Sequence, residues 1–126
     1  MLVRDRMSSP PLSVSPGDSY HAALELMQEH RAHHIPVVEN GRVVGILAER
    51  DLLLAAVNYM QADIDVADIM QSPVVTTTPD TTMTDAARSM VEHRIGGLPV
   101  VDADQTLVGV ITETDIVNAF VEAMSA

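Results

Sequence analysis

Two kinds of apolar pattern alternate along the chain, and the first kind predicts strands. Four short apolar runs come in two pairs, each pair separated by a turn: Ile35–Val38 with Val43–Leu47, and Leu98–Val101 with Leu107–Thr112. Runs of this length, rich in valine and isoleucine, are typical of buried strands. The Asn-Gly pair between the first two runs is a strong signal for a tight hairpin. The pattern therefore predicts two β-hairpins.

The second kind of pattern places apolar residues three and four positions apart, which is the spacing of one helix face. It predicts helices over about Ser19–Arg31, Glu49–Tyr59, Thr82–Arg94 and Glu113–Met124. Thr82 and Asp85 also fit a capping box at the start of the third helix. In chain order, each half of the sequence reads as an extended segment, a helix, two strands and a helix.

The two halves are copies of one another. The matches keep a fixed offset, which grows by one residue in the second hairpin: Met7 with Met70, Pro10 with Pro73, Pro36 with Pro99, Gly45 with Gly109 and Asp51 with Asp115. A copy of this size, roughly 55 residues, would be only marginally stable alone, because it buries little apolar surface. We therefore expect repeats at 1–60 and 61–126 that form one compact module, joined by a polar connector over Gln61–Asp68.

Composition limits the kind of protein this is. The chain has 126 residues, of which 47% are hydrophobic and 2% aromatic, so its core is aliphatic. Without cysteine it forms no disulfide, and it contains no stretch of about 20 apolar residues that would span a membrane. The first residues lack the long apolar segment of a signal peptide. We therefore expect a cytoplasmic protein that does not insert into membranes.

Charge and missing motifs exclude two function classes. The formal net charge is −11, and all seven basic residues are arginines, so the surface repels a nucleic-acid backbone. The chain has no cysteine or lysine nucleophile, no glycine-rich phosphate loop and no Gly-x-Ser-x-Gly motif. We therefore expect neither nucleic-acid binding nor enzyme activity.

The order of these features resembles a known family. Each half shows the same features in turn: Met-x-Ser-Pro, a helix ending in His-Arg, Ile/Leu-Pro-Val-Val, a hairpin, and a strand glycine followed by an acid at a helix start. In this order the sequence resembles a tandem pair of CBS domains, known as the Bateman module. The resemblance covers nearly the whole chain and occurs twice. It implies an α/β (α+β) fold of two βαββα repeats packed with pseudo-two-fold symmetry, the sheets facing each other and the helices outside. Since the resemblance covers nearly all of the residues, we expect a stand-alone CBS protein rather than a module attached to an enzyme, channel or transporter.

The resemblance also implies two clefts between the repeats, which in relatives such as the gamma subunit of AMP-activated protein kinase bind adenosine derivatives. It assigns the ribose to Thr112 and Asp115, where a strand ends and a helix begins. A carboxylate there can accept both hydroxyls of a cis-diol. A capping box is the alternative explanation of Thr-x-x-Asp, and it needs no ligand. Asp51 is the matching residue, but Ala48 stands in place of the threonine, which removes one hydrogen bond of about 1 kcal/mol.

The remaining site residues are also implied by the resemblance. The phosphate side would be formed by His33, His34, Arg50, Arg4 and Thr114. The adenine side would be formed by Val110, Ala32, Ile46, Ile95 and Gly96. Neutral histidines bind phosphate weakly near pH 7, and Arg50 could equally be a solvated residue at a helix end. No metal site is expected, because a metal needs three or four convergent ligands.

Together these features predict a regulatory module without a catalytic cofactor. It would bind an adenine nucleotide or adenosyl ligand, such as AMP, ADP, ATP or S-adenosylmethionine, and signal to an effector protein of unknown identity. The alternative is a ligand-free module for dimerisation or protein docking. The apolar last helix, Ile116–Met124, supplies surface for a homodimer.

Overall fold

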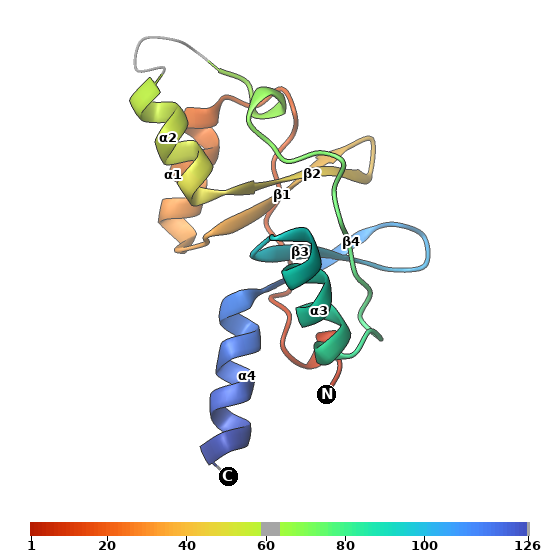
Figure 1. Cartoon of the computed structure of the whole chain (residues 1–126). Coiled ribbons are helices and arrows are strands. Elements are labelled where there is room, and N and C mark those ends of the chain that lie inside the picture. The colour runs from red at the N-terminus through yellow and green to blue at the C-terminus, as the bar shows by residue number, and fades with distance from the viewer. Residues whose placement is uncertain (59–63, 126) are drawn as a thin grey trace. The chain divides into compact units, whose positions relative to one another are not determined.

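The computed structural model describes residues 1–58 and 64–125 (Figure 1). Its helices are α1 (Tyr20–His30), α2 (Glu49–Asn58), α3 (Met83–His93) and α4 (Glu113–Ser125). Its strands are β1 (His34–Glu39), β2 (Arg42–Ala48), β3 (Gly97–Val101) and β4 (Leu107–Thr112). Each strand pair forms its own two-stranded antiparallel sheet. The expected α+β fold class, with four helices and two hairpins, is confirmed.

The structure divides into two compact units that interleave the two repeats. The central unit is Leu12–Val74, and the C-terminal unit is Met1–Pro11 together with Val75–Ala126. Each unit therefore takes its hairpin and helices from one repeat and a further segment from the start of the other. The expected boundary between residues 60 and 61, the end of α2 at Tyr59 and the first part of the connector lie outside the described residues. The repeats at 1–60 and 61–126 stay a prediction.

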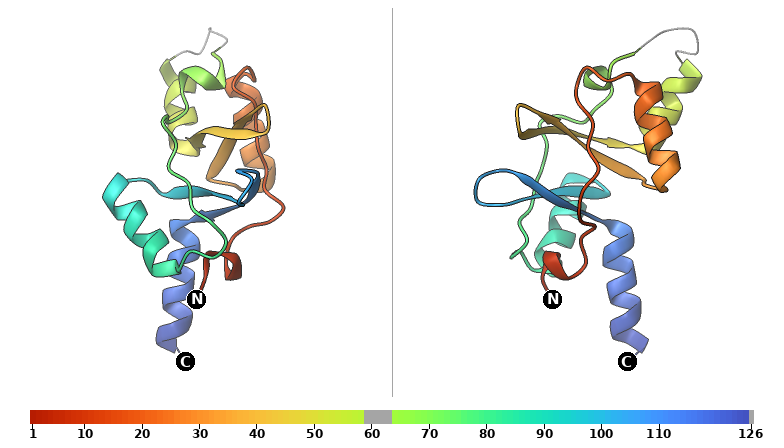
Figure 2. Two further views of the ribbon diagram at one scale, coloured as in Figure 1. Left: turned by 90° about the vertical axis from the view of Figure 1, so that its right-hand side faces the viewer. Right: turned by 180° about the vertical axis from the view of Figure 1, so that it is seen from behind.

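In the central unit, the hairpin turn follows from its two residues. Asn40 and Gly41 have φ angles of 52° and 78°, the left-handed values that a tight two-residue turn requires. The turn pairs Glu39 with Arg42, and a bulge follows at Val37 and Val38. Helices α1 and α2 lie side by side against this hairpin (Figures 1 and 2). The fully buried side chains of this core include Met27, Ile35, Val37, Leu47 and Leu52.

In the C-terminal unit, local hydrogen bonds set the ends of the elements. The Thr82 hydroxyl accepts the N–H of Asp85 at 3.1 Å, which confirms that Thr82 caps α3. In the longer hairpin loop, the Asp102 carboxylate accepts the N–H groups of Asp104 and Thr106, each at 3.0 Å. Helix α4 extends away from the β3–β4 hairpin (Figure 2). The core of this unit includes Leu98, Val100 and Ile111.

A methionine lies on a strand glycine in both units. In the C-terminal unit, Ser8 and Val110 exchange backbone hydrogen bonds of 2.9 and 3.1 Å, which holds Met7 against β4. A Cβ atom at Gly109 would lie 2.7 Å from the Met7 Sδ and 2.9 Å from the Ser8 carbonyl oxygen. In the central unit, a Cβ at Gly45 would lie 2.5 Å from the Met70 Sδ. In each unit, the repeated methionine from one half of the chain therefore packs against the repeated strand glycine from the other half.

Candidate ligand-binding site

The site is built where β4 ends and α4 begins. The N–H and hydroxyl of Thr112 donate to the Asp115 Oδ2, at 2.9 and 3.1 Å. In return, the Asp115 N–H donates to the Thr112 Oγ1 at 3.4 Å. Both residues are half-buried. This is the reciprocal arrangement of a capping box, so the capping explanation describes the contacts of this pair.

The capping contacts leave one carboxylate oxygen of Asp115 available. Both hydrogen bonds that the carboxylate accepts end on Oδ2, and Oδ1 has no partner among the described residues. An ionised carboxylate can accept up to about four hydrogen bonds. The Thr112 contacts therefore orient Asp115 without using its full acceptor capacity, and capping does not prevent it from binding the hydroxyls of a ligand.

The matching position in the central unit is built differently. Asp51 is half-buried in the first turn of α2, but Ala48 has no hydroxyl to cap it. No hydrogen bond to the Asp51 carboxylate is formed within the described part of the chain. The first N–H of α2, from Glu49, donates to the His33 carbonyl oxygen at 2.9 Å, and the His33 Nδ1 lies 3.2 Å from the Glu49 Oε1. Asp51 is therefore the less firmly oriented of the two carboxylates.

The other predicted residues are distributed over both units, and their roles stay predictions. In the central unit, His33 and Arg50 are exposed, Ala32 and His34 are half-buried, and Ile46 is buried in β2. His34 is the first residue of β1 and pairs in register with Ala48. These positions lie at one end of the β1–β2 hairpin and in the first turn of α2 that follows it, except Ile46, which lies further along β2.

In the C-terminal unit, Arg4 forms an ion pair with Asp80 at the surface. Thr114 is exposed on the first turn of α4, and Val110 is buried in β4. Ile95 and Gly96 are half-buried just before β3, where the Gly96 carbonyl oxygen accepts the N–H of Glu113 at 2.9 Å. Of these residues, none lines the cavity beside Asp115.

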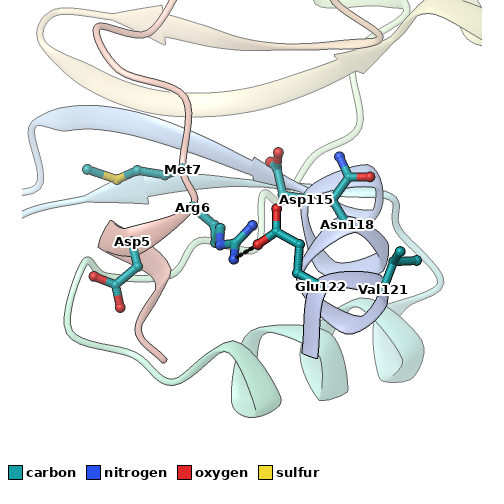
Figure 3. A pocket seen from close by; sticks show the side chains of 7 residues that line it. All are labelled: Asp5, Arg6, Met7, Asp115, Asn118, Val121 and Glu122. Carbon is teal, nitrogen blue, oxygen red and sulfur yellow. Dashed lines mark hydrogen bonds and ion pairs between the residues drawn. The ribbon is translucent and has the colours of Figure 1, made fainter. Parts of the chain in front are cut away.

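A cavity of about 460 Å³ lies beside Asp115 (Figure 3). The cavity is lined by the start of the chain, here called the leading segment (Met1–Pro11), and by α4. The lining residues are Asp5, Arg6, Met7, Asp115, Asn118, Val121 and Glu122. The Arg6 guanidinium forms an ion pair with the Glu122 carboxylate. The Arg6 side chain is 24% exposed and that of Glu122 is 61% exposed. The cavity thus joins the predicted carboxylate to a charged pair that the sequence analysis missed.

The sequence contains a partial signal for these missed residues. Asp115, Asn118 and Glu122 are spaced three and four residues apart, so they share one face of α4. Arg6 is separated from Glu122 by 116 residues, and no local pattern connects them. The helix face could have been found from the sequence, but the arginine that it meets could not.

The Arg6–Glu122 pair shifts the ionisation of both groups. The hydrogen bond from Arg6, and then its positive charge, lower the pKa of Glu122 below its ordinary value of 4.5. The same hydrogen bond raises the pKa of Arg6, with smaller contributions from the charges of Glu122, Asp5 and Asp115. Both groups are therefore charged at neutral pH, and the pair is complete.

We expect the pair to stabilise the fold only above the acidic range. A carboxyl whose pKa is lower in the folded state contributes stability above its unfolded pKa and loses it as the pH falls through the folded pKa. NMR titration of the Glu122 carboxyl should give a pKa below 4.5 in the wild type and a higher value in Arg6→Gln. Equal values in the two proteins would show that Arg6 does not pair with Glu122 in solution.

Two further properties hold for residues 1–58 and 64–125. No three His, Asp or Glu side chains come together there in a way that could hold a metal ion. No helix within these ranges is long and apolar enough to cross a membrane. Helix α4, for example, spans 13 residues and includes Glu113, Asp115 and Glu122.

Both halves of this sequence match one known family, and curated relatives match most of the chain. The chain matches the CBS domain family twice, over residues 3–58 and 66–122. It is 33% identical to the CBS domain-containing protein YhcV of Bacillus subtilis over 115 residues, which cover 90% of this chain and 81% of that protein. It is 32% identical to L-aspartate semialdehyde sulfurtransferase of Methanocaldococcus jannaschii, over 94% of this chain but only 23% of that enzyme.

Solved structures with the same fold include two determined with adenosyl ligands. The CBS domain pair of protein MJ0100, in complex with 5′-methylthioadenosine and S-adenosylmethionine, is 31% identical with a TM-score of 0.88, over 98% of both chains. CBSX2 from Arabidopsis thaliana, in complex with AMP, is 31% identical with a TM-score of 0.81, again over 98% of both chains. These matches confirm the resemblance found in the sequence. The chain belongs to the CBS domain family, as a tandem pair of CBS domains.

Proposed function

We propose that this CBS pair is a regulatory sensor that binds an adenosyl ligand, with Thr112 and Asp115 holding the ribose. The observation that carries the proposal is the Asp115 carboxylate, which Thr112 orients at the start of α4 while Oδ1 keeps its acceptor capacity. A cis-diol presents two adjacent donors to such a group. The relatives MJ0100 and CBSX2, solved with adenosyl ligands, support this choice of ligand class.

The pattern of similarity supports regulation over catalysis. The enzymes among the relatives match this chain over less than a quarter of their own length, including inosine-5′-monophosphate dehydrogenase of Nitrosopumilus maritimus at 23%. A module that recurs beside different catalytic domains is typical of regulation. We therefore propose that ligand occupancy is passed on to a partner protein, and that the adenosyl ligand is a regulator and not a catalytic cofactor.

Titration calorimetry tests the sensor function directly. The purified chain should be titrated with AMP, ADP, ATP, S-adenosylmethionine, 5′-methylthioadenosine and NAD. We expect at least one of them to bind with a Kd below about 1 mM, which corresponds to about 4 kcal/mol. If circular dichroism shows a folded protein and none of these ligands binds in that range, the sensor proposal is wrong.

Exposed apolar side chains on α4 favour a second candidate function, association with another copy of this chain. Val117, Phe120, Val121 and Met124 are 57%, 63%, 53% and 71% exposed. Large apolar side chains grouped on one helix commonly mark an interface. If this is the main function, the melting temperature should rise with protein concentration and ignore every adenosyl ligand.

A further inference from the structure

The cavity beside Asp115 carries an excess of negative charge. The cavity is lined by three carboxylates, those of Asp5, Asp115 and Glu122, and by the guanidinium of Arg6 (Figure 3). These four groups together carry a formal charge of −2. Asn118, Met7 and Val121 add no charge. Helix α4 itself contains no arginine, lysine or histidine between Glu113 and Ser125.

Among the described residues that line the cavity, Arg6 is the one cation, and it already forms an ion pair. The Arg6 guanidinium is paired with Glu122, and Asp5 and Asp115 also act on its charge. The contact joins one guanidinium nitrogen to Glu122, so a phosphate could still reach other N–H groups of Arg6, but it would then lie close to the Glu122 carboxylate, which repels it. The nearby Arg4 is paired with Asp80 and does not line the cavity. A phosphate in the cavity therefore meets net repulsion and, among the described lining residues, no cation that is not already paired.

The N-terminus of α4 attracts anions, but the carboxylates of its own first turn offset this attraction. A helix N-terminus carries about half a positive charge, which favours anions within the first turn. Glu113 and Asp115 already place two carboxylates in that turn. Charges closer than about 8 Å are only partly screened at physiological salt, so a charged group attached to a ribose at Asp115 is acted on by those lining carboxylates that lie within this distance.

We infer that the Asp115 cavity selects adenosyl ligands whose ribose carries a neutral or cationic group, such as a thioether or sulfonium, over nucleotides that carry phosphates. This inference rests on the proposed function and specifies the ligand class of the same site. The charge of the ligand, with the adenosine moiety held constant, decides its affinity. The expected order of affinity is S-adenosylmethionine, then adenosine and 5′-methylthioadenosine, then AMP, then ATP.

The test is a calorimetric series on the whole chain, in magnesium-free buffer, at about 25 mM and about 300 mM NaCl. Adenosine, AMP and ATP share the same adenosine moiety and differ only in the number of phosphates and in the negative charge that these carry. At low salt we expect adenosine to bind at least about threefold more tightly than AMP, and AMP more tightly than ATP, because like charges repel. The higher salt concentration should narrow these differences.

A charge-removing variant assigns the effect to this cavity. Glu122→Gln removes one carboxylate and releases Arg6, so AMP should bind about three- to tenfold more tightly, while adenosine changes by less than about twofold. Glu92→Gln is the matched control, because Glu92 is an exposed acid on α3 of the same unit and does not line the cavity. It should leave both affinities nearly unchanged.

The outcomes separate the inference from the function on which it rests. Tighter binding of AMP or ATP than of adenosine at low salt overturns the inference and leaves the sensor function standing. An unchanged AMP affinity in Glu122→Gln overturns it as well. If a folded protein binds no member of the series, both the inference and the proposed function are wrong.

Discussion

Asp115→Ala is expected to weaken the binding of adenosyl ligands at least tenfold, whereas Asp51→Ala should weaken it by no more than about threefold. Hydrogen bonds to a charged group contribute about 1.5–3 kcal/mol, and 1.4 kcal/mol is a factor of ten in affinity. Asp115 is oriented by two hydrogen bonds from Thr112, while the position three residues before Asp51 is Ala48, which has no hydroxyl, and the Asp51 carboxylate accepts no hydrogen bond among the described residues. Calorimetry with the tightest-binding ligand measures both losses.

The control must separate the lost ligand contact from the lost helix cap. Asp115→Ala also removes half of the capping box of α4, which costs about 1 kcal/mol of stability. Thr82→Val removes the cap of α3 in the same unit, where the hydroxyl accepts the Asp85 N–H, and it leaves Asp115 intact. We expect Thr82→Val to lower the free energy of unfolding by a similar amount and to leave binding unchanged. Equal losses of affinity in Asp115→Ala and Asp51→Ala would contradict the ranking of the two carboxylates.

Gly109→Ala is expected to lower the free energy of unfolding by about 1–3 kcal/mol, the usual cost of forcing an extra methyl group into a packed site. The new Cβ would lie 2.9 Å from the Ser8 carbonyl oxygen, which belongs to the backbone and moves only with the whole segment. Urea unfolding measures the change. Gly17→Ala is the control, because a Cβ at Gly17 would meet nothing within 4 Å, and its effect should stay within about 0.5 kcal/mol.

A second substitution identifies the atom responsible. Met7→Ala in the Gly109→Ala background removes the sulfur that would lie 2.7 Å from the new Cβ, but it leaves the Ser8 carbonyl oxygen in place. It should therefore restore little of the lost stability. Unchanged stability in Gly109→Ala itself would show that the leading segment does not lie on β4 as the structure has it.

The local features of the fold could be predicted because their causes are close in sequence. Each of these features depends on residues within a few positions of each other. They are the helices of period 3.6, the short β-branched strands, the two-residue turn at Asn40 and Gly41, and the cap at Thr82. The pairing of Thr112 with Asp115 belongs to the same class, since these residues are three positions apart. The duplication then predicted that each element would occur twice.

The distant contacts were decided by the tertiary structure. In the structure, Arg4 forms an ion pair with Asp80, and its role toward a ligand stays a prediction. Arg6 meets Glu122, 116 residues away, in the cavity beside Asp115. The structure also exchanges the leading segments, so that Met7 lies on Gly109 and Met70 on Gly45. Apolar periodicity reports which face of an element is buried, but it contains no information on which distant segment covers that face. The sequence alone therefore determined the elements, their duplication and the candidate carboxylate Asp115, and the tertiary structure decided which charges surround this carboxylate.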